Sequence, residues 1–144
     1  MKGIEMTIVT VKVYFEAAHR LHNPDKPDDW NRRVYGKCNN PHGHGHNYVL
    51  EVSVEGEPDP ESGYLIDMKD LKEAIRRTVV NDVDHHHLNH EVHWLAGIVP
   101  TSENLVKVFF ERIEPGLPDG VRLAAVTLHE TERNSATYRR SFDR

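Results

Sequence analysis

The sequence predicts an α+β domain built from antiparallel hairpins, in the order ββ-α-α-ββ. Apolar and polar residues alternate near both ends of the chain, which is the period of half-buried strands. Between these segments, apolar residues recur at helical spacing behind residues that cap helices well. Because a chain of 144 residues suits one hydrophobic core, we expect residues 1–144 to form a single domain.

The first two predicted strands are long and lie on either side of a loop. Residues 8–18 alternate, and one side of this strand is apolar: Val9, Val11, Val13, Phe15 and Ala17. The second strand runs from about His44 to Glu55. Residues 23–40 are rich in Asp, Pro, Asn and Arg, which predicts a long loop, and residues 56–63 form a turn region.

Two helices and two further strands follow. Asp67 can cap a helix that runs to about Val80, with an apolar stripe of Met68, Leu71, Ile75 and Val79. The histidine-rich residues 84–93 are predicted to form a loop. Thr101 caps the second helix, in which Arg112 is the polar exception to the apolar spacing. Residues 121–130 form the third strand and residues 135–140 a short fourth strand.

The bulk properties exclude several classes of protein. The formal net charge of −5 argues against general nucleic-acid binding, which requires a basic surface. No apolar run approaches the ~20 residues that span a membrane, and the N-terminus lacks the apolar core of a signal peptide. The single cysteine cannot form an intrachain disulfide. We therefore expect a cytoplasmic protein.

Three histidines can converge on the buried face of the first hairpin. His44 and His46 lie two residues apart on a predicted strand, so they point to the same side. His19 shares a side with the apolar residues of the first strand if that strand keeps its register. Three neutral imidazoles with one open position are typical of a catalytic zinc site. The alternative is a chance His-x-His pair without a metal.

The only cysteine, Cys38, lies in a polar segment six residues before His44. A buried, inert cysteine is more often found in an apolar run. The neighbouring Lys37 favours the thiolate form, which is the reactive form of the side chain. From its surroundings alone, Cys38 is equally compatible with a surface cysteine that has no function.

Two further groups have the chemistry of a site. In Asp84-His85-His86-His87, a carboxylate can orient an imidazole for proton transfer, although a solvated loop or a second metal site would have the same composition. Glu130 ends an apolar strand face. A carboxylate in that place either lies in solvent at the strand end or accepts two parallel hydrogen bonds from a guanidine-like edge, such as a 2-aminopyrimidinone ring.

In order along the chain, these segments resemble the 6-pyruvoyl tetrahydropterin synthase family. The matching segments are Phe15-Glu16-Ala17-Ala18-His19-Arg20-Leu21, Gly36-Lys37-Cys38-Asn39-Asn40-Pro41, Gly43-His44-Gly45-His46-Asn47-Tyr48, Gly63-Tyr64-Leu65-Ile66-Asp67, Asp84-His85 with Leu88-Asn89, Pro100-Thr101-Ser102-Glu103-Asn104 and Glu130-Thr131. They extend from about residue 10 to 140. The chain departs from the family pattern at Val83 and in the extra histidines His86 and His87.

The resemblance implies roles for these residues. It implies Zn²⁺ on His19, His44 and His46. It implies Cys38 as the base that abstracts a proton, with Asp84 and His85 completing a catalytic triad. It implies Glu130 as the anchor of the pterin ring, with Thr101 nearby.

The resemblance also implies the fold, the assembly and the reaction. The fold is the tunnelling fold (T-fold), in which sheet edges join into a trimeric barrel and two trimers stack as a hexamer, with active sites between subunits. The reaction converts 7,8-dihydroneopterin triphosphate into 6-pyruvoyl tetrahydropterin with loss of triphosphate. The basic side chains that hold the triphosphate are not evident from the sequence; Arg20, Lys37 and Arg139 are candidates.

The related 6-carboxy-tetrahydropterin synthases of the queuosine (7-deazaguanine) pathway are the alternative. They share the substrate, fold and zinc but also release acetaldehyde. Their cysteine typically lies closer to the Gly-His-Gly-His element, so the spacing between Cys38 and His44 favours the pyruvoyl branch, as does the long segment between His85 and Pro100. Two other classes remain open: a pterin- or purine-binding module without catalysis, and a structural metal protein that chelation would unfold.

Overall fold

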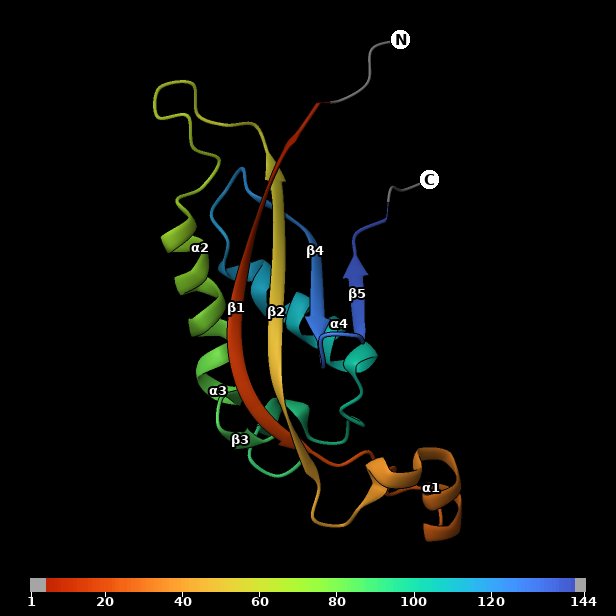
Figure 1. The fold of residues 1–144 in the computed structure, drawn as a ribbon. Coiled ribbons are helices and arrows are strands. Elements are labelled where there is room, and N and C mark those ends of the chain that lie inside the picture. The colour runs from red at the N-terminus through yellow and green to blue at the C-terminus, as the bar shows by residue number, and fades with distance from the viewer. Residues whose placement is uncertain (1–4, 142–144) are drawn as a thin grey trace.

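A five-stranded sheet with three of its four helices packed on one face forms the fold, and the remaining helix, residues 28–35, lies beyond one end of the sheet (Figure 1). The computed structural model describes residues 5–141, so the two ends of the predicted 1–144 domain, residues 1–4 and 142–144, lie outside the described residues. The strands are β1 (Thr7–His19), β2 (His44–Gly56), β3 (His86–His87), β4 (Arg122–His129) and β5 (Ser135–Arg139). The helices are α1 (Asp28–Tyr35), α2 (Met68–Ile75), α3 (Asn81–Val83) and α4 (Ser102–Ile113).

The sheet order is β3-β1-β2-β4-β5. The strands β1, β2, β4 and β5 are antiparallel neighbours, as the sequence predicts, whereas β3 pairs with β1 in parallel. In the β1–β2 hairpin Thr7 lies opposite Gly56 and His19 lies opposite His44. The register between β2 and β4 shifts after Ser53, which leaves one extra residue in β4 and a local twist of the strand.

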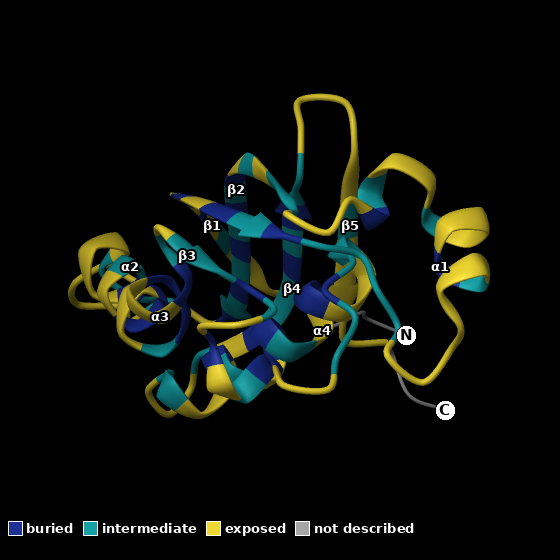
Figure 2. Cartoon of the chain, turned by 90° about the horizontal axis from the view of Figure 1, so that it is seen from below, coloured by how far each residue is buried: buried dark blue, intermediate teal, exposed yellow. Residues whose placement is uncertain are grey.

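The core lies between the sheet and the helices (Figure 2). Alternate residues of β1 and β2 are buried, from Val11 to Ala17 and from Tyr48 to Val54. Phe15 and Tyr48 lie opposite each other in the hairpin, and their rings stack with centroids 4.8 Å apart. Phe109 of α4 meets Phe15 edge-on at 6.1 Å.

The predicted helix caps are confirmed. The Asp67 side chain accepts a hydrogen bond from the backbone N–H of Lys69, and Thr101 Oγ1 accepts one from the backbone N–H of Asn104. The first predicted helix continues past Ile75 through a π-helical turn, Arg76–Val80, into α3. Met68 is not part of the buried stripe, because its side chain lies on the outer face of the first turn and is 54% exposed.

The prediction of a loop at residues 23–40 is wrong. This segment contains α1 and a 3₁₀ turn, Gly36–Asn39. Helix α1 has acidic residues in its first turn and basic residues in its last turn, which suits the helix dipole. Its one buried residue is Asn31, whose amide donates to the backbone carbonyls of Asn23, Lys26 and Pro27. The helix lacks an apolar stripe, so hydrophobic periodicity does not reveal it.

The prediction of a loop at residues 84–93 is also incomplete. Residues 86–87 form β3, and a 3₁₀ turn follows at His93–Leu95. The backbone N–H of His85 donates to Glu16 O (2.6 Å), and that of Leu88 donates to Ala18 O (2.7 Å). The side chain of Leu88 is fully buried, so it anchors the segment against β1.

Arg112, the polar exception in α4, belongs to a small cluster. Its Nε donates to Thr78 O in the π-helical turn (2.8 Å), and its guanidinium lies 4.1 Å from the centre of the Trp94 ring. The indole N–H of Trp94 donates to Asp82 Oδ2 (2.9 Å). Arg112 therefore satisfies a carbonyl in the irregular turn and stacks on an aromatic ring.

Among the described residues, no helix is both long and apolar enough to cross a membrane.

Replacing Phe15 by alanine tests the packing of the hairpin. Phe15 is 3% exposed, so Phe15→Ala is expected to lower the free energy of unfolding by roughly 3–5 kcal/mol, measured by urea denaturation. The matched control is Tyr14→Ala on the opposite face of β1, where the side chain is 68% exposed; its effect should stay within about 0.5 kcal/mol. Equal losses in the two variants would contradict the burial of this face.

Candidate metal centre and the cavities beside it

The structure brings His19, His44 and His46 together. One ring nitrogen of each lies within 4.8 Å of the others, and the three rings stand edge to face with centroids 4.6, 5.1 and 4.9 Å apart. The β1–β2 register creates this group, because it places His19 opposite His44, while His46 follows on the same side of β2. These three residues can therefore hold a metal ion.

The geometry of the group fits a tetrahedral ion. His19 Nε2 and His44 Nε2 are 3.1 Å apart, close to the roughly 3.3 Å between two nitrogens that share a tetrahedral zinc at 2.0–2.1 Å. His46 Nε2 is buried and has no hydrogen-bond partner among the described residues. A buried ring nitrogen without a partner is costly, and a metal ion would satisfy it.

His19 is held as a neutral ligand. Its Nδ1 donates to the backbone carbonyl of Pro100 (2.8 Å), so the lone pair lies on Nε2, which faces His44. Burial lowers the pKa of His19 to about 4, and the neighbouring His44 and His46 act in the same direction, although the Pro100 carbonyl opposes them. The imidazole is therefore uncharged at neutral pH, as metal binding requires. A carbonyl partner of this kind fixes the orientation of a metal-binding ring.

Glu130 lies just beyond β4 and beside this group. Its Oε1 is 3.8 Å from His46 Nε2, and its Oε2 accepts a hydrogen bond from Ser102 Oγ (3.2 Å). Burial lowers the pKa of His46 despite the opposing charge of Glu130. Burial also raises the pKa of Tyr48 well above its usual range, with Glu130 acting in the same direction.

Asp84 and His85 form a second polar group with Glu16. His85 Nδ1 is 2.9 Å from Asp84 Oδ1, and His85 Nε2 is 3.3 Å from Glu16 Oε2. Asp84 Oδ1 also accepts a hydrogen bond from the backbone N–H of Glu16 (2.9 Å). Burial acts to raise the pKa of Asp84, but the Glu16 N–H and the adjacent imidazoles outweigh it, so the pKa lies below its ordinary value.

The backbone of His85 adopts the left-handed region, with φ of 63°, and it is the one non-glycine residue between 5 and 141 that does so. Such a conformation is strained for a residue with a Cβ atom. The hydrogen bond from the backbone N–H of His85 to the backbone carbonyl of Glu16 holds His85 in this conformation. Strain of this kind is often found at functional sites.

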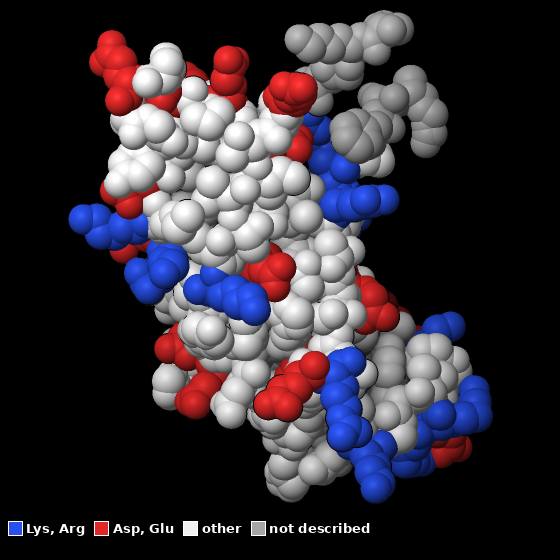
Figure 3. Space-filling model, turned by 45° about the horizontal axis from the view of Figure 1, so that its top comes forward, with Lys and Arg blue, Asp and Glu red and all other residues white. Residues whose placement is uncertain are grey.

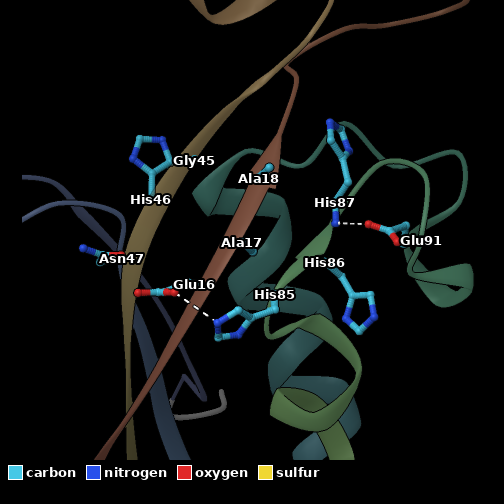
Figure 4. A pocket seen from close by; sticks show the side chains of 10 residues that line it. All are labelled: Glu16, Ala17, Ala18, Gly45, His46, Asn47, His85, His86, His87 and Glu91. Carbon is cyan, nitrogen blue, oxygen red and sulfur yellow. Dashed lines mark hydrogen bonds and ion pairs between the residues drawn. The ribbon is translucent and has the colours of Figure 1, made fainter.

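Two open cavities meet at Gly45, His46 and Asn47 of β2. The first has a volume of about 550 Å³ and is lined also by Glu16, His85, His86, His87 and Glu91. Figure 4 shows Glu16 on β1 paired with His85 among the residues that line this cavity. The second, about 540 Å³, is lined also by His129, Glu130, Thr131 and Glu132. His46 therefore lines both the cavity that contains His85 and the cavity that contains Glu130.

Cys38 lies apart from these two cavities. It is half-buried in the 3₁₀ turn Gly36–Asn39, and its carbonyl accepts a hydrogen bond from the backbone N–H of Leu21 (2.9 Å).

Thr101 uses its hydroxyl to cap α4. It lies between Pro100, whose carbonyl orients His19, and Ser102, whose hydroxyl contacts Glu130. One chain thus brings together the three histidines and Glu130 but does not place Cys38 in the same cavity.

The extra histidines do not form a second group like the first. Within the described part of the chain, His19, His44 and His46 are the one set of three such residues close enough to share a metal. The ring of His87 stacks on that of His90, with centroids 4.3 Å apart. His86 Nδ1 is buried without a hydrogen-bond partner among residues 5–141.

Sequence reasoning did not identify Glu16, Pro100 or Ser102 as parts of the site. Glu16 contacts both Asp84 and His85, Pro100 orients His19, and Ser102 contacts Glu130. One signal was available for Glu16, which is a charged residue three positions before the buried His19 at the end of β1. Pro100 contacts His19 through its backbone carbonyl alone, so no pattern of side chains in the sequence predicts this contact.

The chain is similar to known proteins over nearly its whole length. Residues 8–141 match the family described as 6-pyruvoyl tetrahydropterin synthase. A 6-pyruvoyl tetrahydrobiopterin synthase of Poecilia reticulata is 41% identical over 125 residues, which are 87% of this chain and 84% of the relative. The human protein of that name is 37% identical over 131 residues, 91% of this chain and 90% of the relative.

A solved structure agrees with these sequence relatives. The structure of Caenorhabditis elegans 6-pyruvoyl tetrahydropterin synthase superposes with a TM-score of 0.89 at 38% identity, and the match covers 98% of this chain and 100% of that one. The α+β arrangement predicted from the sequence is therefore confirmed, whereas the joining of sheets into an oligomeric barrel is not visible in one chain.

Replacing His44 by alanine tests the metal centre. His44→Ala removes one of three nitrogen donors, so the affinity for zinc should fall by more than the roughly 10–100-fold that the loss of a supporting residue costs, measured by titration against a chelator. His42→Ala is the matched control, because His42 is exposed and lies outside the group. An equal loss of affinity in both variants would contradict the assignment.

Proposed function

The chain belongs to the 6-pyruvoyl tetrahydropterin synthase family, and we propose that it is a zinc-dependent lyase converting 7,8-dihydroneopterin triphosphate into 6-pyruvoyl tetrahydropterin and triphosphate. The observation that carries the proposal is the group of three histidines beside a carboxylate at the rim of an open cavity. The names of the animal relatives support the pyruvoyl product.

His19, His44 and His46 would hold the zinc. When bound, zinc supplies a Lewis acid that polarises hydroxyl groups of the substrate side chain and acidifies the neighbouring C–H bonds. The protein contributes three nitrogen donors from two paired strands. His19 is fully buried and oriented by Pro100, so this donor is in place before a metal arrives.

Proton transfer is assigned to Cys38, Asp84 and His85. The thiolate of Cys38 is proposed as the base that removes a proton from the substrate side chain. Asp84 accepts from Nδ1 of His85, which leaves Nε2 as the nitrogen that exchanges protons with the substrate. Glu16 lies 3.3 Å from that nitrogen, so the carboxylate would have to give up this contact when substrate enters.

Glu130 is proposed to anchor the pterin ring. A carboxylate can accept two parallel hydrogen bonds from the amino group and ring N–H of a 2-aminopyrimidinone. The Ser102 hydroxyl fixes one oxygen of Glu130. Thr101, the residue before Ser102, caps α4 and so fixes the start of the helix that carries Ser102. The carboxylate is therefore oriented before the substrate binds.

We propose that the enzyme is a hexamer, a dimer of trimers joined through sheet edges. The edge strands of the described sheet are β3 and β5, and their outer backbone groups are available for pairing with another copy. Because Cys38 lines neither cavity beside the histidines, a neighbouring subunit would complete the site.

Mass analysis of the pterin product tests the reaction. Incubation of the zinc-loaded enzyme with dihydroneopterin triphosphate should yield the pyruvoyl product and triphosphate. Cys38→Ala should keep its circular dichroism spectrum and zinc content but lose at least about 100-fold in turnover, the lower range for removing a proton-transfer group. A carboxy product with acetaldehyde would assign the chain to the related synthase, and full turnover in Cys38→Ala would exclude the thiol as base.

Titration with neopterin, which has the ring but no triphosphate, tests the anchor. Glu130→Gln keeps the shape of the side chain but loses its charge and one acceptor, so the dissociation constant should rise about tenfold or more. Glu132→Gln, an exposed residue lining the same cavity, is the matched control and should bind as the wild type does. Unchanged binding in Glu130→Gln would remove Glu130 from the ring site.

A further inference from the structure

A third cavity, of about 300 Å³, lies beside the 3₁₀ turn that carries Cys38. Three of its eight lining residues carry positive charge: Arg20, Arg32 and Lys37. One carries negative charge, Asp28, and the others are Gly36, Asn39, Asn40 and Pro41. This cavity, called the Arg20 cavity below, shares no lining residue with the two cavities beside the histidines.

The surroundings of the Arg20 cavity are basic in an acidic protein. Residues 20–37 contain five Lys or Arg residues and three Asp residues, whereas the whole chain has a net charge of −5. Figure 3 shows Lys and Arg gathered at the lower right, over the end of the molecule where α1 lies. A local excess of positive charge of this kind attracts small anions.

Arg20 is fixed in place by contacts on both sides. Its backbone N–H donates to Asn89 Oδ1 (2.8 Å), and its backbone carbonyl accepts from Asn89 Nδ2 (2.8 Å). Its Nε donates to Asn39 O (2.9 Å). The terminal nitrogens of the guanidinium have no hydrogen-bond or ion-pair partner among residues 5–141, and this planar fork matches the oxygens of a phosphate.

The other charged residues of the cavity differ in availability. Arg32 pairs with Asp29, and Asp28 disfavours an anion at its side of the cavity. Lys37 is exposed, and no carboxylate between residues 5 and 141 pairs with it. Arg20 and Lys37 are therefore the two cations that are available to a ligand.

Residues that line the Arg20 cavity are sequence neighbours of reactive groups of the proposed site. Arg20 directly follows the metal-binding His19, and Lys37 and Asn39 flank Cys38. The two wall segments are joined by the hydrogen bonds from Leu21 N–H to Cys38 O (2.9 Å) and from Asn39 Nδ2 to Leu21 O (2.8 Å). An anion in this cavity would thus contact residues that directly neighbour Cys38 and His19 in the chain.

We infer that the Arg20 cavity is an anion subsite that binds the triphosphate group of the substrate through Arg20 and Lys37. The inference rests on the proposed function, because that reaction supplies the polyanion. The same two cations would counter the charge on the triphosphate as it leaves, and Arg20, which is fixed in advance, is well suited to this task.

Calorimetric titration with inorganic triphosphate tests the inference without any turnover. Arg20→Gln should weaken binding by roughly tenfold or more, because charge-assisted hydrogen bonds are lost, and Lys37→Gln should weaken it severalfold. Arg33→Gln is the matched control: it makes the same charge change on α1, but Arg33 does not line the cavity. Its affinity should stay within twofold of the wild type.

Two further variants keep the test decisive. Lys37 is exposed, so Lys37→Gln remains informative if Arg20→Gln does not fold. His44→Ala weakens the metal centre but leaves the cavity intact, so it should bind triphosphate as the wild type does. The inference is overturned if Arg20→Gln and Lys37→Gln bind normally, if Arg33→Gln is weakened as much as they are, or if binding disappears in His44→Ala because the metal had held the anion.

This outcome is separate from that of the proposed function. The product analysis uses the wild-type enzyme and does not depend on which residues hold the triphosphate. A pyruvoyl product together with normal triphosphate binding in Arg20→Gln and Lys37→Gln would reject the subsite alone.

Discussion

The antiparallel register between β1 and β2 is the constraint on which the rest of the site depends. It places His19 opposite His44 and leaves His46 on the same side of β2. A slip of one residue would turn one strand's side chains to the other face of the sheet. The stacked pair of Phe15 and Tyr48, which are also direct partners, opposes such a slip. The same register therefore packs the core and places the imidazoles.

The start of α4 connects this hairpin to the remaining site residues. Three consecutive residues each make one contact: the Pro100 carbonyl accepts from His19, the Thr101 hydroxyl caps the helix, and the Ser102 hydroxyl donates to Glu130. A shift of this segment would disturb the side chains of His19 and Glu130 together. The orientation of one metal-binding histidine and of the proposed pterin anchor thus depends on the same short piece of backbone.

The parts of the site that follow a local period could be predicted from the sequence. Alternation along the two strands is enough to bring His19, His44 and His46 to one face, and the caps at Asp67 and Thr101 depend on neighbouring residues alone. Motifs in a fixed order also identify the family, which the comparisons confirm. The roles of Cys38, Asp84, His85 and Glu130 come from that resemblance and stay predictions.

The features that were missed depend on contacts between distant residues or lack an apolar signal. Helix α1 buries only Asn31, so its sequence looks like that of a loop. Strand β3 has two residues and exists because β1 pairs with it. The contact of Glu16 with Asp84 joins positions 68 residues apart. The half-exposed surroundings of Cys38 give no indication of its function in one chain.

X-ray absorption spectroscopy of the zinc-loaded protein tests the central claim most directly, namely that the β1–β2 register builds a three-histidine metal centre. The spectrum should fit three imidazole nitrogens at about 2.0–2.1 Å and one further light atom. A sulfur ligand at about 2.3 Å would mean that Cys38 binds the metal instead of standing free as a base. Fewer than three imidazoles would mean that the register does not build the site.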